Sequence, residues 1–153
     1  MIDAGDAEVY EKYADELVRF ATVLAGPSNA EDLVADAVVR VFLSPGWPAV
    51  TNRRAYLYRS VLSEAASAAR SSRRRTAREH RVGRWADDGT PTVLRPEVVE
   101  AARALSVRQR AVVFMTFWLD APTDEIADVL SLSTRTVQRE LQAALTRMER
   151  HLS

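Results

Sequence analysis

The sequence predicts an all-α protein built from two small helical domains joined by a flexible linker. Apolar residues recur at steps of three and four along most of the chain, and no alternating apolar and polar run is long enough for a sheet. A stretch with two glycines and two prolines, GRWADDGTPTVLRP, then divides the chain. We therefore expect domains over residues 1–82 and 97–153, with the linker over 83–96.

The first domain is predicted to contain three helices. The first runs over about 6–24, where the apolar positions are Tyr10, Tyr13, Leu17, Phe20 and Leu24. Ser28 and Glu31 have the spacing of a capping box, which would begin a second helix that ends at the prolines and glycine of 45–48. A third helix is expected from residue 52 to about 78, and its second half runs into the arginines of 70–75.

The second domain is predicted to contain one helix over 97–118 and then a helix-turn-helix. Its small core would consist of Ile126, Ala127, Leu130, Val137 and Leu141. Ser133 is placed to cap the second helix of this motif, so the polar residues that follow it would point outward, where such a helix meets a DNA major groove. The alternative is an ordinary helical hairpin with a solvated polar face.

Several aromatic residues outside this motif are predicted to be structural. Tyr10, Tyr13 and Phe20 share the spacing of a buried stripe, and Trp47 is expected to plug the end of the second helix. The cluster of Phe114, Phe117 and Trp118 either seals the C-terminal core or lies under a bound regulator, and its apolar character favours the core.

The composition excludes several classes of protein. The chain has no cysteine, so a disulfide framework and a thiolate metal site are impossible. The N-terminal residues are acidic and lack the basic start and apolar run of a signal peptide, and no apolar run approaches the roughly 20 residues of a membrane span. We therefore expect a protein of the cytoplasm.

The formal net charge is zero, but the charges are segregated along the chain. Residues 1–36 carry nine acidic and two basic residues, whereas 40–84 carry eleven arginines and two acidic residues. A basic segment of this kind can hold phosphates whatever the rest of the chain carries. The arginine run is either a solvated helix end or a nucleic-acid contact, and its place beside a long helix favours the contact.

No residue pattern indicates an enzyme. The histidines are His80 and His151, and neither lies in a nucleophile or metal-ligand arrangement. The acid pairs Asp32/Asp36 and Asp124/Asp128 supply too few oxygen ligands for a divalent ion. We expect no catalytic residue, no cofactor, no metal site and no small-molecule substrate.

Taken together, the motifs resemble those of a bacterial sigma factor of the extracytoplasmic-function (ECF) group in the sigma-70 family, a minimal promoter-recognition subunit of RNA polymerase. Residues 30–42, AEDLVADAVVRVF, are similar to that family's polymerase-binding helix. Residues 52–59, NRRAYLYR, and the arginine run resemble its promoter-melting helix. Residues 105–113 and the helix-turn-helix pattern resemble its fourth region, which reads the upstream promoter element.

The resemblance implies three sets of contacts, with core RNA polymerase, promoter DNA and an anti-sigma factor as partners. Core polymerase would be bound by Asp32, Asp36 and Arg40. The melted −10 element would be bound by Tyr56, Arg59, Ser63, Glu64, Ser67, Arg70, Arg73, Arg74 and Arg75. The −35 element would be bound by Arg108, Ser133, Thr134, Arg135, Thr136, Gln138, Arg139 and Gln142. Aromatic and arginine side chains suit unwound DNA because they stack on bases and follow the backbone.

Three positions depart from the family pattern. Ala35 stands where members usually have glutamine, and Ser63 where many have asparagine. Glu140 stands in the recognition helix where members carry basic residues. It would either point away, accept a hydrogen bond from a cytosine amino group, or mark weak upstream binding.

Two alternative functions stay open, and Ala35 and Glu140 motivate the first of them. One is a sigma-like protein that binds polymerase or an anti-sigma regulator without reading promoters. The other is a stand-alone helix-turn-helix regulator, in which residues 97–153 alone would bind an operator, in the usual case as a dimer.

Overall fold

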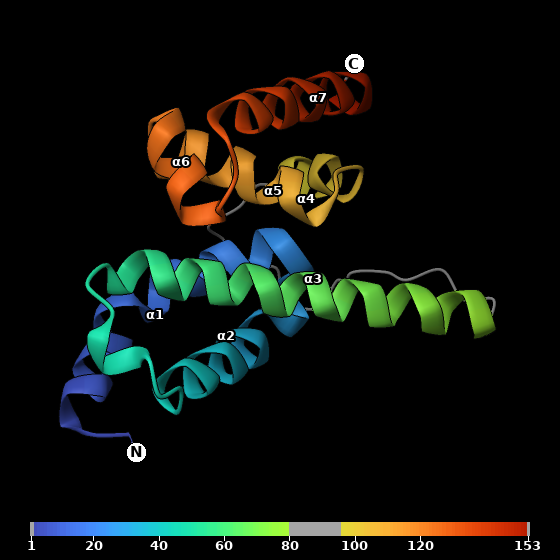
Figure 1. The fold of residues 1–153 in the computed structure, drawn as a ribbon. Coiled ribbons are helices and arrows are strands. Elements are labelled where there is room, and N and C mark those ends of the chain that lie inside the picture. Colours follow the sequence, from blue (N-terminus) through green and yellow to red (C-terminus); the bar gives the residue numbers. More distant parts are fainter. Residues whose placement is uncertain (1, 80–95, 153) are drawn as a thin grey trace.

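All regular structure within residues 2–79 and 96–152, which the computed structural model describes, is helical (Figure 1). The α-helices are α1 (Ala4–Ala25), α2 (Pro27–Phe42), α3 (Arg53–Glu79), α4 (Pro96–Arg103), α5 (Val107–Val113), α6 (Thr123–Leu130) and α7 (Thr134–Leu152). A 3-10 turn, η1 (Trp47–Ala49), precedes α3, and a π-helical turn, η2 (Phe114–Trp118), follows α5. The predicted all-α fold class is confirmed. Of the predicted linker, only Pro96, the first residue of α4, lies within the described residues.

The ends of α1 and the start of α2 are set by local chemistry. Asp3 accepts a hydrogen bond from the Asp6 N–H (2.9 Å) and Asp6 accepts one from the Asp3 N–H (3.2 Å), so a capping box begins α1. Gly26, at φ 91°, separates α1 from α2, and Pro27 is the first residue of α2. The predicted capping box at Ser28 is wrong, because proline suits the first helical position and the helix begins there instead.

The predicted continuous helix over 97–118 is also wrong. It breaks after Arg103, and α5 begins with a second capping box, in which Ser106 accepts from the Gln109 N–H and Gln109 accepts from the Ser106 N–H, both at 3.1 Å. The Ser-x-x-Gln spacing was visible in the sequence. Beyond the break, α4 packs against α7.

The first three helices pack around a buried apolar core. Leu17, Phe20, Val34 and Val61 are fully buried in it, as the apolar spacing predicts. Tyr13 packs against this core from its edge, whereas Tyr10 is 38% exposed and the prediction that it is buried is wrong.

Trp47 closes one end of this bundle, as predicted. It is buried, the centroid of its ring lies 5.3 Å from that of the Phe42 phenyl ring, and its Nε1–H donates a 2.9 Å hydrogen bond to the buried Asp6 carboxylate. The side chain therefore ties the loop after α2 to the first turn of α1.

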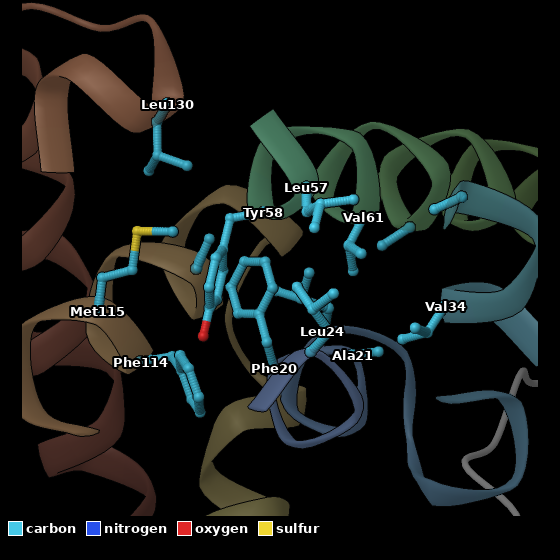
Figure 2. Close-up of a cluster of buried hydrophobic side chains, with 14 of the residues drawn as sticks. Phe20, Ala21, Leu24, Val34, Leu57, Tyr58, Val61, Phe114, Met115 and Leu130 are labelled. Atoms are coloured by element: carbon cyan, nitrogen blue, oxygen red, sulfur yellow. The ribbon is translucent and has the colours of Figure 1, made fainter. Parts of the chain in front are cut away.

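The two halves of the chain share one hydrophobic core. Phe20 of α1 packs against Tyr58 of α3 and Phe114 of η2 (Figure 2), and its ring centroid lies 4.8 Å from that of Tyr58 and 5.2 Å from that of Phe114. Met115 and Leu130 belong to the same buried cluster. In Figure 1, α5 and α6 accordingly lie against α1 and α3, while α7 lies on the far side of this second layer.

No helix in the described ranges is both long and apolar enough to cross a membrane.

Candidate nucleic-acid interface

The helix-turn-helix motif is formed by α6 and α7. Ile126, Ala127, Leu130 and Val137 are buried between the two helices, as predicted. Ser131 adopts a left-handed conformation (φ 57°) in the turn, and the Leu132 N–H donates to the Ala127 carbonyl at 2.9 Å. This tight connection fixes the direction in which α7 leaves α6.

Ser133 caps α7. Its Oγ accepts a 3.0 Å hydrogen bond from the Thr136 N–H and donates to the Thr136 hydroxyl at 2.9 Å. Both hydroxyl groups are thus engaged within the first turn of the helix, and Thr136 is only partly exposed. The cap orients the outward residues that follow.

One face of α7 presents polar side chains to solvent. Its exposed members are Thr134, Arg135, Gln138, Arg139 and Gln142. Arginine, glutamine and threonine are residue types that read base edges and bind phosphates in the major groove. This face has the chemistry that the sequence predicts for a recognition helix.

Glu140 does not lie on this face. Its side chain is 24% exposed, and its carboxylate lies 3.7 Å from the Arg108 guanidinium on α5. Of the three explanations open from the sequence, the structure therefore favours the first, in which Glu140 points away from the recognition face. Arg108, a predicted −35 contact, is 53% exposed at its side chain beside this carboxylate.

A second polar face runs along α3. Ser63, Ser67, Arg70 and Arg74 are exposed on it. Tyr56 is partly buried, with its ring 6.0 Å from that of Trp47. The side chains of Arg73 and Arg75, also predicted contacts, lie outside the described residues.

Two predicted −10 contacts are engaged with other parts of the protein. The Arg59 guanidinium donates to the carbonyl oxygens of Val129 (2.9 Å) and Asp128 (3.4 Å) in the last turn of α6. Cations are stabilised at this end of a helix. Glu64 forms an ion pair with Arg40 of α2, which joins a predicted promoter contact to a predicted polymerase contact.

A groove of about 360 Å³ lies beside the start of α3, between it and α6. Its lining includes Asn52, Tyr56 and Arg59 from the first half of the chain and Glu125 and Asp128 from the second. An aromatic ring and a guanidinium suit a nucleic-acid base, whereas the carboxylates repel phosphate.

The exposed face of α2 carries the third predicted set. Asp32 and Asp36 are exposed one turn apart, with Ala35 exposed beside them. Sequence reasoning missed Val39 and Leu43, which are 46% and 58% exposed and extend the same face. Their spacing from Asp36 was the available signal, because steps of three and four place residues on one side of a helix.

Polar groups at the junction of the two halves were also missed. Glu16 of α1 accepts hydrogen bonds from the Arg54 Nε–H (2.6 Å) and the Tyr58 hydroxyl (2.9 Å). Burial and the Glu16 carboxylate raise the pKa of Tyr58 above its usual value. Burial alone would lower the pKa of Arg54, but the hydrogen bond and negative charge of Glu16 raise it overall.

Among the described residues, no group of three or more histidine, cysteine, aspartate or glutamate side chains could hold a metal ion.

Comparison with known proteins gives a consistent assignment. A family model described as "Sigma-70, region 4" matches residues 95–148. The RNA polymerase sigma-E factor of Streptomyces avermitilis is 28% identical over 97% of this chain and 87% of its own length. The ECF RNA polymerase sigma factor SigL of Mycobacterium tuberculosis is 29% identical over 90% of this chain and 82% of its own length. The chain is thus similar to ECF RNA polymerase sigma factors over nearly its whole length, and its residues 95–148 match sigma-70 region 4.

The chain also shares its fold with a solved structure. The sigma factor RpoE of Bartonella quintana, in complex with the anti-sigma factor NepR, matches with a TM-score of 0.76 and 19% identity over 95% of both chains. The resemblance predicted from the sequence motifs is confirmed.

Proposed function

We propose that the protein is an ECF sigma factor that directs promoter-specific initiation by binding core RNA polymerase and two promoter elements. Residues 1–82 would bind polymerase through α2 and the melted −10 element through α3, and residues 97–153 would bind the −35 element through α7. The predicted linker, 83–96, would set the reach between them. The protein would act by binding, without catalysis or cofactor, in the cytoplasm where polymerase works.

The observation that carries this proposal is the exposed polar face of α7 above a complete helix-turn-helix core. The Ser133 cap holds the first turn, and Arg135, Gln138 and Arg139 stand exposed on the side away from that core. This arrangement supports insertion of α7 into a major groove. Because α3 carries a separate basic face, one chain offers surfaces for two elements.

Two observations support this function over its alternatives. Glu140, one of the two residues that suggested a protein unable to read promoters, is paired with Arg108 off the recognition face. A stand-alone regulator in residues 97–153 would expose Phe114 and Met115, which are buried in the core shared with α1 and α3. An anti-sigma factor is proposed as a further partner because the similar sigma factor RpoE was solved in complex with one.

The test is reconstitution. The purified chain is mixed with core RNA polymerase and a library of promoter fragments, and the transcripts are sequenced. We expect a stable complex and transcripts that start at a fixed distance from one shared two-part motif. A variant with Arg135, Gln138 and Arg139 changed to alanine is expected to bind polymerase but lose selection of the upstream part. Absence of any directed transcript would contradict the proposal.

A further inference from the structure

One face of α3 carries polar side chains along most of its length. With about 100° of rotation per residue, these side chains fall within an arc of roughly 80° around the helix. They are Tyr56, Arg59, Ser63, Ser67, Arg70 and Arg74. The buried residues Tyr58, Val61 and Ala65 lie on the opposite side. The polar side chains therefore form one continuous stripe that points away from the core.

The two halves of this stripe differ in accessibility. At the start of α3, Arg59 donates to the Val129 and Asp128 carbonyls, and Tyr56 lines the groove between α3 and α6. In Figure 1 the last turns of α3 extend past α6 and past the ends of α1 and α2. Arg70 and Arg74 are exposed on these turns. The second half of the stripe is thus open while the first half is in contact with α6.

The two halves also differ in composition. Residues 65–78 contain only alanine, serine, threonine and arginine, with five arginines and no acidic residue. The aromatic residues of α3 are Tyr56 and Tyr58, and both lie in its first half. Bases of a melted strand are held mainly by stacking on aromatic side chains. The second half of α3 has no such side chain to offer.

This composition suits the backbone of a DNA duplex. Arginines bind phosphates without reading sequence, and small side chains between them let a helix lie close to the strand. Arg70 and Arg74 are one turn apart, about 5–6 Å between Cβ atoms, so both can contact the same strand. From Arg59 to Arg74 the helix rises by roughly 22 Å, or about six base-pair steps. One helix can therefore contact a melted segment at its start and the adjoining duplex at its end.

We propose that the second half of α3, through Arg70 and Arg74, is a phosphate-binding site for duplex DNA that requires neither a promoter sequence nor melting. The inference rests on the proposed function, because it places the duplex beside the element that α3 would hold melted. It moves both arginines from the melted −10 element, which the family resemblance implied, to the duplex between the two promoter elements. Because this site is open while α6 holds Arg59, the free chain can bind duplex DNA in its compact state.

Duplex DNA fits this site better than other anionic partners do. A helix that lies on a membrane buries large apolar side chains in the lipid, and residues 65–78 have none. Duplex RNA also presents a phosphate backbone. However, the site continues the stripe of Tyr56 and Arg59, which is proposed to bind promoter DNA, and duplex RNA is therefore the comparison in the test.

The test uses the full chain, free and assembled with core polymerase. Arg70→Ala/Arg74→Ala removes two exposed charges and keeps good helix formers at both positions, which circular dichroism verifies. Lys12→Ala/Arg19→Ala removes the same charge from α1 and is the matched control. The affinity of the free chain is measured by fluorescence anisotropy over a series of salt concentrations. The probes are the selected promoter duplex, an unrelated DNA duplex and an RNA duplex.

We expect Arg70→Ala/Arg74→Ala to raise the Kd of the free chain roughly three- to tenfold, as the loss of two exposed charge pairs implies. The factor is expected to be the same on both DNA duplexes. The dependence of log Kd on log salt should become shallower by about two, because two fewer phosphates are neutralised. The α1 control is expected to change Kd much less, and the RNA duplex to bind more weakly than DNA.

The polymerase complex separates a duplex contact from a contact with the melted strand. The Arg70→Ala/Arg74→Ala complex is expected to bind the promoter less tightly but, at saturation, to show the permanganate reactivity of wild type. Uncharged methylphosphonate groups in the duplex between the two elements should abolish the difference in affinity between variant and wild type. The same groups in the melted segment should leave that difference in place.

Unchanged duplex binding, an equal loss in the α1 control, or tighter binding of RNA than of DNA would each overturn the inference. Reduced permanganate reactivity at saturation would also overturn it, because Arg70 and Arg74 would then hold the melted strand. If promoter-directed transcription works but the double variant behaves as wild type, the inference alone fails. If the double variant weakens duplex binding but no promoter is selected, the proposed function alone fails.

Discussion

Arg110 on α5 donates a 2.7 Å hydrogen bond to the backbone oxygen of Leu24 at the end of α1. The same guanidinium donates to the carbonyls of Ala102 (2.7 Å) and Arg103 (3.3 Å) at the end of α4. Burial lowers the pKa of Arg110 to about 10, which leaves the group charged at neutral pH. One side chain thus serves two helix ends, one in each half of the chain.

Replacing Arg110 with methionine is expected to destabilise the protein by about 2–5 kcal/mol. Methionine keeps much of the apolar stem but removes the donors, so buried carbonyl groups at two helix ends lose their partners. The free energy of unfolding is measured by urea denaturation, followed by circular dichroism and tryptophan fluorescence.

The matched control is Arg108→Met, which changes an exposed arginine on the same helix. We expect that variant to lose less than about 1 kcal/mol. Equal stability of the two variants would show that the carbonyl contacts of Arg110 contribute little to the junction.

Stability is expected to fall above about pH 10 because of Tyr58. Its pKa is raised by burial and by the Glu16 carboxylate, so the folded protein keeps the phenol proton at a pH where the unfolded chain releases it. The unfolded state then binds fewer protons, and stability decreases as pH rises. Below the pKa of about 10 that tyrosine has in the unfolded chain, the contribution of Tyr58 to the free energy of unfolding is fully present.

The measurement is the free energy of unfolding of wild type and Tyr58→Phe between pH 8 and pH 11, roughly the window around the phenol pKa. Tyr58→Phe is expected to have a flatter profile at the alkaline end, whereas Tyr10→Phe, at an exposed site, follows wild type. A profile of Tyr58→Phe that is as steep as that of wild type would rule out Tyr58 as the source.

Local features of this fold could be predicted from the sequence, whereas contacts between distant segments could not. The bounds of α1, α2 and α3 differ from the expected ones by one or two residues, because caps, prolines and apolar spacing act locally. The junction of Phe20 with Phe114 joins residues from opposite halves of the chain, and no periodicity encodes such a pairing. The sequence of each half shows only that it has an apolar stripe, not which residues of the other half pack against it.

The candidate site was predictable to a similar extent. The exposed faces of α3 and α7 follow from helical spacing. The same spacing predicts that Glu140 lies off the recognition face. The pairing of Arg40 with Glu64 depends on how α2 packs on α3. Phe117 and Trp118 were expected in the core but are 64% and 42% exposed, because only Phe114 and Met115 of η2 turn inward.

The Arg40–Glu64 pair predicts a rescue experiment. Arg40→Ala leaves the Glu64 carboxylate without its partner on the helix proposed to hold melted DNA, where it would repel phosphate. We expect Arg40→Ala to reduce transcription even at saturating polymerase, and Arg40→Ala/Glu64→Gln to restore part of it. Run-off transcription with increasing polymerase separates this effect from weaker polymerase binding.

The control for this pair is Asp36→Asn, which alters the polymerase face of α2 without touching Glu64. We expect the transcription defect of Asp36→Asn to be corrected by a higher polymerase concentration and not by Glu64→Gln. If Glu64→Gln does not restore transcription by Arg40→Ala, the Arg40–Glu64 pair does not shield DNA from the Glu64 carboxylate.

Arg59 predicts that promoter opening separates α3 from α6. Two of its guanidinium nitrogens hold the Val129 and Asp128 carbonyls and the acidic side chains of α6 line the same groove, so a melted strand that takes up these donors would displace α6. Because the chain has no cysteine, dyes can be attached at Ala68→Cys on α3 and Glu149→Cys on α7. We expect energy transfer between them to fall when polymerase and melted promoter DNA are bound, and unchanged transfer in a permanganate-reactive open complex would contradict the separation.

The matching substitution is Arg59→Ala, with Arg19→Ala on α1 as the control. Because Arg59 is exposed, its loss is expected to leave the melting temperature nearly unchanged. It should nevertheless reduce permanganate reactivity of the promoter several-fold, since the melted strand loses a backbone contact. Unchanged protein stability together with reduced promoter melting would identify Arg59 as a DNA contact. Normal promoter melting by Arg59→Ala would contradict this role and leave only its structural contact with the end of α6.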